Sequence, residues 1–242
     1  MLNEFIHTAF KGRFVINLRR RPDRYAAFIE TVSPHFDHEL IERFDAVDGQ
    51  AIDIQARHVA FKHMGNRAEI GCHLSHRGIW KRVSEDPSIG DGDLVLVFED
   101  DVFFTKNGFA DRLIDSVELL RRQGDRYKLL YIGGRFDPDF VPVPGDVESH
   151  WIRKDGGLYE RLSEKPRNRR IFDRTTHSLV FTKGTARLLY EWSIDDLHPK
   201  KPAAVDQFLV WCHRQNKGAI TSYDYFPHIC YSPLHYTSDI QV

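Results

Sequence analysis

The chain has 242 residues, of which 41% are hydrophobic and 12% aromatic, enough for one large domain with a packed core. Its 34 basic and 35 acidic residues give a net charge of −1, which disfavours bulk nucleic-acid binding because that function normally shows as a basic excess. The three cysteines are widely spaced and form no zinc-binding pattern, so we expect free thiols in a reducing compartment.

The chain shows no sequence signal for secretion or membrane insertion. Residues Met1–Lys11 lack the positive start and the long apolar stretch of a signal peptide. No run approaches the roughly 20 apolar residues that cross a bilayer. We therefore expect a soluble, cytoplasmic protein without signal peptide or transmembrane helix, for which peripheral contact with a membrane and the oligomeric state stay open.

The first half of the chain alternates predicted strands and helices. Phe14–Leu18 is an apolar run typical of a strand, and Pro22 then lies in the first turn of a helix, where proline is tolerated. Leu40–Val47 predicts a second strand that ends at a turn. A further helix is predicted over Glu69–Val83, before a stretch rich in Gly, Pro and Asp.

The second half continues this alternation around one irregular segment. The predicted elements are a strand over Leu94–Phe98, a helix with the apolar residues Phe109, Leu113, Ile114 and Val117, strands over Tyr127–Ile132 and His177–Thr182, a helix over Gly184–Trp192, a helix that begins at Pro202, and short strands near Ala219–Tyr223 and His228–Tyr231. Residues 135–176 carry four prolines and weak periodicity. Long irregular segments in compact domains are usually functional or disordered, and this one is a candidate functional segment.

The order of elements predicts the α/β class. Strands that alternate with helices favour a Rossmann-like, mainly parallel central sheet flanked by helices on both faces. We expect residues 1–242 to form a single domain. The first strand is not followed by Gly-x-Gly-x-x-Gly, and the chain contains no Gly-x-x-x-x-Gly-Lys-Ser/Thr, so the usual dinucleotide and P-loop functions are disfavoured.

Three consecutive acids, Glu99, Asp100 and Asp101, directly follow the predicted strand over Leu94–Phe98. This places carboxylates at the carboxyl end of a buried strand, where open α/β sheets usually bind ligands. Adjacent acids repel one another, so a compensating hard cation such as Mg²⁺ or Mn²⁺ is one interpretation. A solvated turn is the other, because Asp is common in turns.

Several segments of the chain, taken together, resemble a known family. They are Val15–Leu18 with Arg21–Arg24, Ala46–Gly49, Gly71–His76 with Trp80, Phe98–Val102, His177–Phe181 with Gly184 and Ala186, Val205–Phe208, and the tail His235–Ile240. In this order they resemble glycosyltransferase family 25, which includes bacterial lipooligosaccharide galactosyltransferases and procollagen galactosyltransferases. The resemblance spans residues 13–240, and the segment 71–76 and the three acids are its most specific parts.

The resemblance implies a GT-A glycosyltransferase fold and an inverting, metal-dependent transfer. A hexose, first galactose and next glucose, would move from a UDP-sugar to a hydroxyl of a glycan or glycoconjugate. The diphosphate leaves poorly unless its developing negative charge is neutralised, which a carboxylate-held Mn²⁺ or Mg²⁺ can do. Asp101 is the first choice for direct metal contact. Glu99 is a further candidate ligand, and Glu99 or Asp100 would hold the ribose or a metal-bound water.

The resemblance assigns two roles in the C-terminal part of the chain. His235 is a candidate metal ligand through its neutral imidazole, and a surface histidine is the alternative. Asp206 is the candidate base that takes the proton of the acceptor hydroxyl. We expect Asp206 in a first helical turn, where the helix dipole favours an ionised carboxylate and would also give this acid a purely stabilising role.

A group of residues is expected to contact the nucleotide sugar. Its members are Asn17, Arg24, Asp48, Gly71, Ser75, His76, Glu99, Asp100 and His177. Gly71 would allow close backbone approach, and Ser75 and His76 can form hydrogen bonds. The alternative is an ordinary helix in which Ser75 and His76 are satisfied locally, which a helical stretch from Leu74 to Trp80 would show. Arg24 could equally be an exposed helix residue, and Asp48 part of a turn.

The irregular segment also holds a basic cluster, made of Arg161, Lys165, Arg167, Arg169, Arg170 and Arg174. A solvated face is the favoured interpretation, and a mobile loop that meets an anionic glycan or membrane is the other. Two other functions also stay open for the whole chain. These are nucleotide-sugar binding without transfer, and a metal-dependent phosphohydrolase that uses the three acids.

Overall fold

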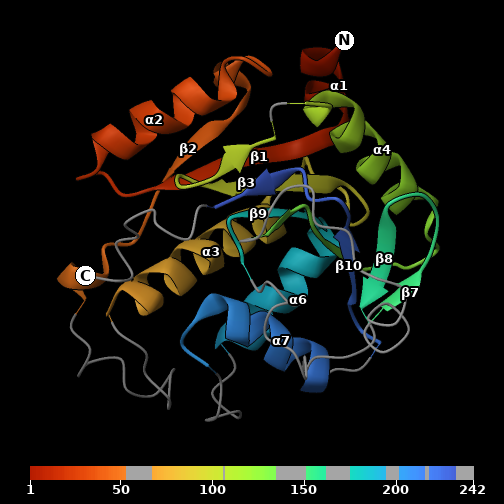
Figure 1. Ribbon diagram of the computed structural model, residues 1–242. Helices are drawn as coiled ribbons and strands as arrows, with labels where there is room; N and C mark the ends of the chain where they lie inside the picture. The colour runs from red at the N-terminus through yellow and green to blue at the C-terminus, as the bar shows by residue number, and fades with distance from the viewer. Residues whose placement is uncertain are drawn as a thin grey trace.

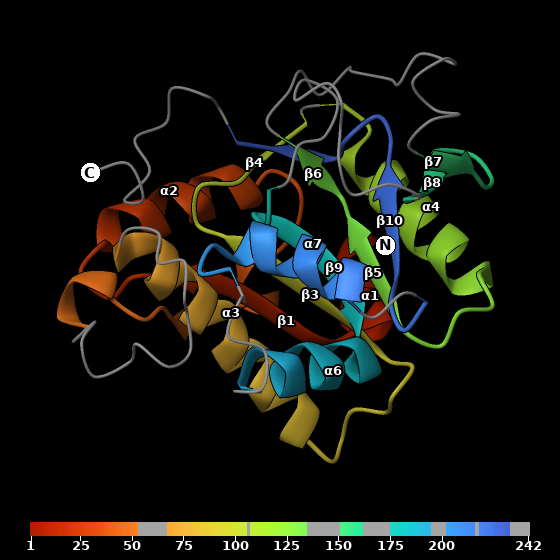
Figure 2. The ribbon, with the colours of Figure 1, turned by 90° about the horizontal axis from the view of Figure 1, so that it is seen from below.

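A computed structural model describes residues 1–52, 67–105, 107–134, 151–161, 175–194, 202–215 and 218–232. In this part of the chain, a large sheet separates two layers of helices, as Figures 1 and 2 show from two directions. The predicted α/β class, with a central sheet flanked by helices, is confirmed. None of the described helices combines the length and the apolar character needed to cross a membrane.

The large sheet has the strand order β2-β1-β3-β9-β5-β10-β8-β7. Its strands are β1 (Phe10–Asn17), β2 (Glu42–Asp45), β3 (Leu94–Glu99), β5 (Lys128–Tyr131), β7 (Trp151–Arg153), β8 (Leu158–Arg161), β9 (Ser178–Thr182) and β10 (Thr221–Tyr225). β1 pairs in parallel with β2 and β3, and β10 with β5, whereas β9 runs antiparallel to β3 and β5. The sheet is therefore mixed, and the carboxyl ends of β1, β2 and β3 meet at one edge.

A smaller sheet is formed by three short strands, which follow β3, β5 and β10 in the chain. It has the order β4-β11-β6, with β4 (Phe103–Phe104), β6 (Gly133–Gly134) and β11 (Cys230–Tyr231). β4 begins two residues after Asp101, the last of the three acids, and β6 begins two residues after the end of β5. This sheet therefore fixes the path of the chain just beyond the carboxyl ends of β3 and β5.

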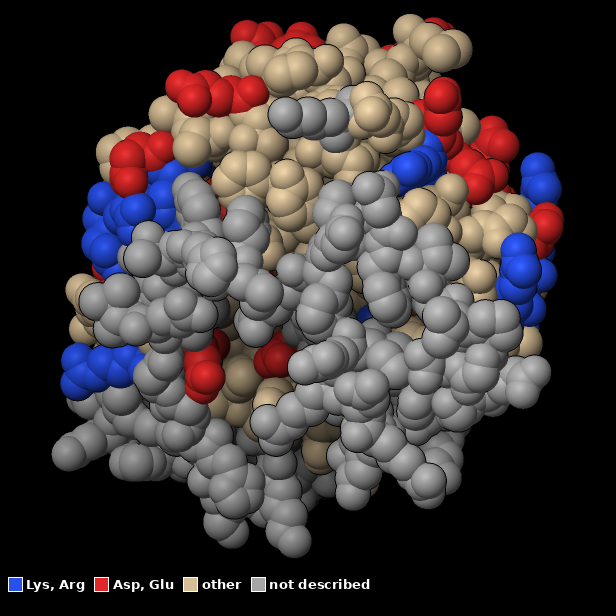
Figure 3. All heavy atoms as spheres, in the orientation of Figure 1, with Lys and Arg blue, Asp and Glu red and all other residues tan. Residues whose placement is uncertain are grey.

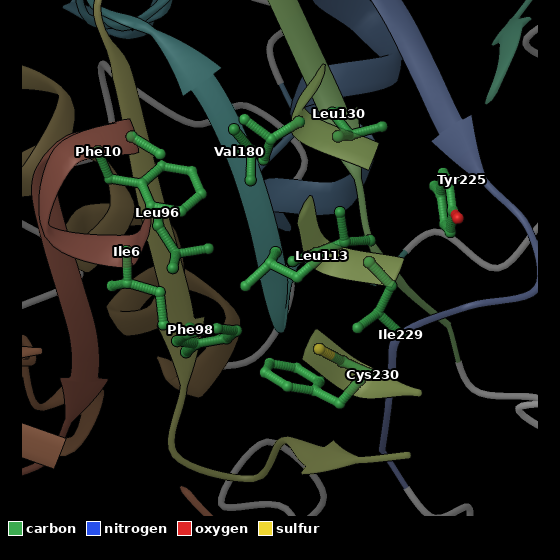
Figure 4. Packing of buried hydrophobic residues seen from close by; sticks show 14 of the residues in the cluster. Ile6, Phe10, Leu96, Phe98, Leu113, Leu130, Val180, Tyr225, Ile229 and Cys230 are labelled. Carbon is green, nitrogen blue, oxygen red and sulfur yellow. The ribbon is translucent and has the colours of Figure 1, made fainter. Parts of the chain in front are cut away.

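Helices cover both faces of the large sheet. They are α1 (Leu2–Ala9), α2 (Pro22–Val32), α3 (Arg67–Glu85), α4 (Phe109–Arg122), α6 (Lys183–Ile194) and α7 (Val205–Gln215), with short 3₁₀ turns η1 (His38–Leu40) and η2 (Gly49–Ala51). On one face, α1, α2 and α4 share a buried apolar cluster with β3, part of which is drawn in Figure 4. On the other face, α3, α6 and α7 form a second cluster.

β3 lies at the centre of this arrangement. Its five apolar residues are at most 5% exposed, because β1 and β9 flank the strand and helices cover both of its faces. A continuous apolar run is typical of a strand covered in this way. The strand extends one residue further than predicted and includes Glu99.

Most of the predicted elements are confirmed, with shifted ends. β1 begins four residues earlier than predicted, β2 is confined to four residues, and α7 begins three residues after Pro202. Several elements were not predicted: the short strand β4, the 3₁₀ turns η1 and η2, α1, and the hairpin β7–β8 inside the segment described as irregular. The hairpin turn is closed by Leu158 N, which donates to Asp155 O, and its central residues are Gly156, at φ 53°, and Gly157. The run Asp-Gly-Gly is a strong hairpin signal in the sequence.

Candidate active site

A cavity of about 320 Å³ lies at the sheet edge where β1 and β3 end. Its wall includes all three consecutive acids, Arg20 and Arg24 from the loop and helix after β1, and Ser75 from α3. Residues 46–50, which follow β2, complete this side. A volume of this size is within the usual range for small-molecule sites, and the edge is where α/β sheets bind ligands.

Asp100 is fully engaged by protein groups. Arg24 Nη2 lies 2.5 Å from Asp100 Oδ1, and Asn17 Nδ2 donates a 2.6 Å hydrogen bond to Asp100 Oδ2. All three side chains are at most 10% exposed. Arg24 is thus a buried partner of the acids, which corrects the alternative of an exposed helix arginine. Asp100 holds the loop after β3 against β1 and α2.

Glu99 is held by a different set of groups. Its Oε1 lies 3.0 Å from His76 Nε2 and accepts a 2.6 Å hydrogen bond from Thr176 Oγ1. Cys72 Sγ is 3.9 Å from the same oxygen. Burial raises the pKa of Glu99, but the hydrogen bonds of His76 and Thr176 outweigh it and hold this pKa below its usual range.

Asp101 has a buried oxygen to spare. Its Oδ1 is buried and has no hydrogen-bond partner among the described residues, and its Oδ2 lies 3.7 Å from Arg24 Nη2. Burial raises the pKa of Asp101, and the charge of Glu99 raises it further, while Arg24 opposes both. A buried, unpaired carboxylate oxygen in a cavity wall fits a hard divalent cation.

The segment 71–76 lies within α3, so the helical alternative for it is the one observed. Ser75 Oγ donates to Gly71 O at 2.7 Å and accepts from Val47 N at 2.8 Å, which is local satisfaction. A Cβ on Gly71 would lie 2.7 Å from Val47 O, so this glycine lets α3 pack on the chain after β2. The close approach that Gly71 makes in the structure is therefore to protein backbone. Ser75 lines the cavity, whereas His76 does not.

Asp48 combines a turn role with a place in the cavity wall. Its carboxylate accepts a 3.0 Å hydrogen bond from Gln50 N, which caps η2, and a 2.7 Å ion pair from Arg20. The Arg20 hydrogen bond lowers the pKa of Asp48, which keeps this acid ionised. Further Lys and Arg side chains gather on the surface near the start of α2, at the left of Figure 3.

His177 and Asp206 approach the acids from other elements. The carbonyl of His177 accepts from Glu99 N at 2.9 Å, and its buried ring acts electrostatically on Glu99. Asp206 lies in the first turn of α7, as predicted. Its charge contributes to raising the pKa of both Cys72 and Tyr131, so this half-buried acid is within electrostatic reach of the cavity and of the end of β5.

Two predicted features fall outside the described residues. These are His235, and all of the basic cluster except Arg161, which is paired with buried Asp224. The cavity also includes residues that were not assigned a role from the sequence, namely Arg20, Gln50, Arg67 and Cys72. Cys72 stands within the specific segment 71–76, four residues before His76, and that spacing on a helix is the signal that could have identified it.

Comparisons with known proteins agree with the sequence resemblance. Residues 10–133 match the family described as glycosyltransferase family 25 (LPS biosynthesis protein). Inactive glycosyltransferase 25 family member 3 of Homo sapiens is 34% identical over 144 residues, which cover 51% of this chain and 22% of that protein. Procollagen galactosyltransferase 2 of Mus musculus is 31% identical over 137 residues, 51% of this chain and 21% of that protein.

One relative matches nearly the whole chain. It is a glycosyltransferase 25 family member of Aedes aegypti, 27% identical over 255 residues, which cover 93% of this chain and 36% of that protein. The chain therefore spans less than a quarter of the human and mouse relatives and about a third of the mosquito one. Every cavity residue named above lies within the matched segment 10–133.

Proposed function

This chain belongs to glycosyltransferase family 25, and on that premise we propose that it is a metal-dependent, inverting glycosyltransferase of the GT-A type. The donor would be a UDP-sugar, UDP-galactose before UDP-glucose, and the acceptor a hydroxyl of a glycan or glycoconjugate. The name of the mouse relative, procollagen galactosyltransferase 2, supports galactose as the first choice. The single domain would span residues 1–242.

The observation that carries this proposal is the surplus of carboxylate in the cavity wall. Asp100 and Asp101 share one buried guanidinium, that of Arg24, while Glu99 is held by His76 and Thr176, and Asp101 keeps a buried oxygen without a partner among the described residues. Such a site is poorly suited to a phosphate by itself, because the acids would repel it. It suits a divalent cation, which a diphosphate could then share.

We propose Asp101 as the direct ligand of Mn²⁺ or Mg²⁺, with Glu99 and, from the tail, His235 as further candidate ligands. When bound, the ion supplies Lewis-acid neutralisation of the charge that develops on the leaving diphosphate. Asp100 is already engaged by Arg24 and Asn17, so its role is to fix the position of Asp101. Arg24 lowers the net charge of the acids and thereby limits their mutual repulsion.

We propose that the donor nucleotide lies along the other side of the cavity. Asp48 and Ser75 line that side, and Asp48, held ionised by Arg20, would accept hydrogen bonds from ribose hydroxyls. Arg20 and Arg67 at the same wall carry the positive charge that an anionic donor needs. His76 and His177 would act through Glu99, which they hold in place.

Asp206 is the proposed catalytic base. Its carboxylate would take the proton of the acceptor hydroxyl as that oxygen attacks the anomeric carbon and the bond to the diphosphate breaks. Its place in the first turn of α7 keeps a carboxylate ionised, as a base requires. Its charge acts on Cys72, which lines the cavity, and this proximity supports the role.

The proposal is tested by following UDP release from UDP-galactose and UDP-glucose, with and without Mn²⁺. The acceptors would be a collagen-type peptide and a lipopolysaccharide-core oligosaccharide, added separately. We expect release that requires the ion and an acceptor, and that Asp101→Asn abolishes. Asp111→Asn, which changes an exposed acid on α4, is the matched control and should act like the wild type. Unchanged turnover in Asp101→Asn would falsify the metal assignment.

A second candidate function is binding of the nucleotide sugar without transfer. It is favoured by the human relative, whose name describes it as inactive. Calorimetry separates the two functions: tight, Mn²⁺-dependent binding of a UDP-sugar, together with no transfer to any acceptor tested, would support binding alone. Transfer to any one acceptor would exclude it.

A further inference from the structure

Three side chains of different ligand type meet beside the cavity. Cys72 Sγ lies 3.9 Å and His76 Nε2 lies 3.0 Å from the same oxygen of Glu99, and the three atoms are all within 4.8 Å of one another. From this cluster we infer a second metal site, formed by Cys72, His76 and Glu99, which takes Zn²⁺ in preference to the hard ions proposed for Asp101.

The two distances from the Glu99 oxygen are close to those of a tetrahedral zinc site. With Zn–S near 2.3 Å and Zn–N or Zn–O near 2.1 Å, two ligand atoms at the tetrahedral angle are about 3.4 to 3.6 Å apart. The distances from the Glu99 oxygen, 3.0 and 3.9 Å, lie on either side of that value. Shifts of a few tenths of an ångström bring these two distances to that value. The ligand atoms of Cys72 and His76, which lie within 4.8 Å of each other, would approach by rotation about their side-chain torsions.

The ligands stand on rigid elements. Cys72 and His76 are four residues apart on α3, so their side chains lie on the same face of the helix, one turn apart. Glu99 is the last residue of β3, whose backbone is fixed on both sides by β1 and β9. Cys72 and Glu99 also line the cavity, so a fourth ligand, water or a ligand oxygen, can reach the ion from there.

The ligand types determine which metal is favoured. A thiolate and an imidazole together are ligands of Zn²⁺, whereas Mg²⁺ and Mn²⁺ prefer oxygen. As the sulfur–zinc bond forms, the thiol proton is released to solvent, and the imidazole binds through its neutral nitrogen. A site with one sulfur, one nitrogen and one oxygen thus differs in selectivity from an all-oxygen site at Asp101, although Glu99 and Asp101 are only two residues apart.

Zinc at this site would change the cavity. Glu99 Oε1 would exchange its hydrogen bonds from His76 and Thr176 for the ion. The cavity wall would also gain positive charge close to Asp101, which weakens binding of a second cation there. The concentration of free zinc would therefore change the affinity of the cavity for its other ligands.

Metal binding by the purified chain tests this inference without any nucleotide sugar, so its failure is distinguishable from failure of the proposed function. Zn²⁺ affinity is measured by competition with a chromogenic chelator, and Co²⁺ is used as a spectroscopic substitute. We expect one equivalent of Co²⁺ to give a thiolate-to-cobalt charge-transfer band. Cys72→Ser should remove the band and weaken zinc binding more than about tenfold, the lower end of what even an outer-shell change costs a metal site.

Cys212→Ser is the matched control, because Cys212 is a buried thiol in the apolar cluster of α7 and should not affect the band. His76→Gln gives a second test, since an amide keeps a donor toward Glu99 and loses the imidazole ligand. Thermal unfolding of the metal-free variants checks that each is folded. Absence of the band in the wild type, its survival in both Cys72→Ser and His76→Gln, or displacement of Zn²⁺ by equimolar Mn²⁺ would overturn the inference.

Discussion

Two buried pairs of arginine and aspartate lie toward different edges of the large sheet, and they differ in how their charges are balanced. Near β8 and β10, Arg161 binds both oxygens of Asp224, and Trp151 Nε1 donates a further 2.8 Å hydrogen bond to Asp224 Oδ2. The guanidinium also lies 3.7 Å from the centre of the Tyr131 ring. Here one cation meets one anion, and each carboxylate oxygen has a donor.

At the cavity, one guanidinium meets two carboxylates, those of Asp100 and Asp101, and a third, that of Glu99, lies beside them. Arg24 and Asn17 satisfy Asp100, His76 and Thr176 hold one oxygen of Glu99, and Asp101 Oδ1 is left without a partner in the described part of the chain. The comparison supports a structural role for the first pair and a binding role for the second. A balanced pair satisfies its own charges, whereas surplus buried charge needs a proton or a bound cation to compensate it.

The largest expected effect comes from removing the surplus charge. Asp101→Asn should lower transfer at least about a hundredfold, because Lewis-acid neutralisation is worth several kcal/mol. The same variant should unfold at a higher temperature than the metal-free wild type, since burial and Glu99 disfavour the ionised form of Asp101 in the folded protein. Activity assays and calorimetric scans of the two proteins measure whether transfer falls and whether the unfolding temperature rises. A variant that is less active and also less stable would indicate a structural role for Asp101.

The next effect concerns the proposed base. Asp206→Asn should lower the turnover number by about 10² to 10⁴, the usual range for loss of general base catalysis. The change in unfolding free energy should be no more than about 1 kcal/mol, because an acid in a first helical turn contributes only that much. Turnover and urea unfolding measured side by side decide between the catalytic and the stabilising role. Turnover equal to that of the wild type, together with reduced stability, would leave only the stabilising role.

Removing one partner of the balanced pair, Arg161 and Asp224, should instead lower the stability of the fold. Asp224→Ala leaves Arg161 buried without its carboxylate and should cost about 3 to 5 kcal/mol of unfolding free energy, as removal of one partner of a buried ion pair does. Asp45→Ala breaks an exposed ion pair with Arg19 and is the control, with an expected cost below about 1 kcal/mol. Urea unfolding measures both. Similar costs for the two variants would contradict the assignment of Asp224 as structural.

A smaller effect arises from His228, which lies beside the balanced pair. Burial lowers the pKa of His228 from its usual 6.5 to about 4, and the charges of Asp224 and Arg161 act in opposite directions. His228 is therefore harder to protonate in the folded chain than in the unfolded chain. Stability should fall as the pH drops from 6.5 to about 4, by up to about 3 kcal/mol from this group. His228→Gln should flatten that slope in unfolding experiments, and an unchanged slope would exclude His228 as its cause.

The features that were predicted from the sequence are local ones. β3, the acids after it and the first-turn position of Asp206 follow from contiguous residues, as does the start of α2 at Pro22. The structural partners were not predictable in this way. Asn17 and Asp100 are 83 residues apart in the chain, and only the parallel register of β1 and β3 brings them together.

Two features of the structure could not be deduced from the sequence, for identifiable reasons. The missing side chain of Gly71 admits the backbone near Val47, and a glycine in a sequence does not indicate what approaches it. Contact of Gly71 with a nucleotide sugar stays a prediction. The hairpin β7–β8 was masked by the surrounding prolines and charges, although Asp155 and Gly156 carried the turn signal.

The central claim is that the surplus carboxylate makes the cavity a site for a cation and a nucleotide sugar together. It is tested most directly by thermal unfolding of the wild type and Asp101→Asn with Mn²⁺, with UDP-galactose, and with both. A ligand that binds only the folded state at a hundred times its dissociation constant adds about 2.7 kcal/mol to the unfolding free energy. We predict a clear rise in unfolding temperature for the wild type with both ligands present, and none for Asp101→Asn. An equal rise in the two proteins would contradict the claim.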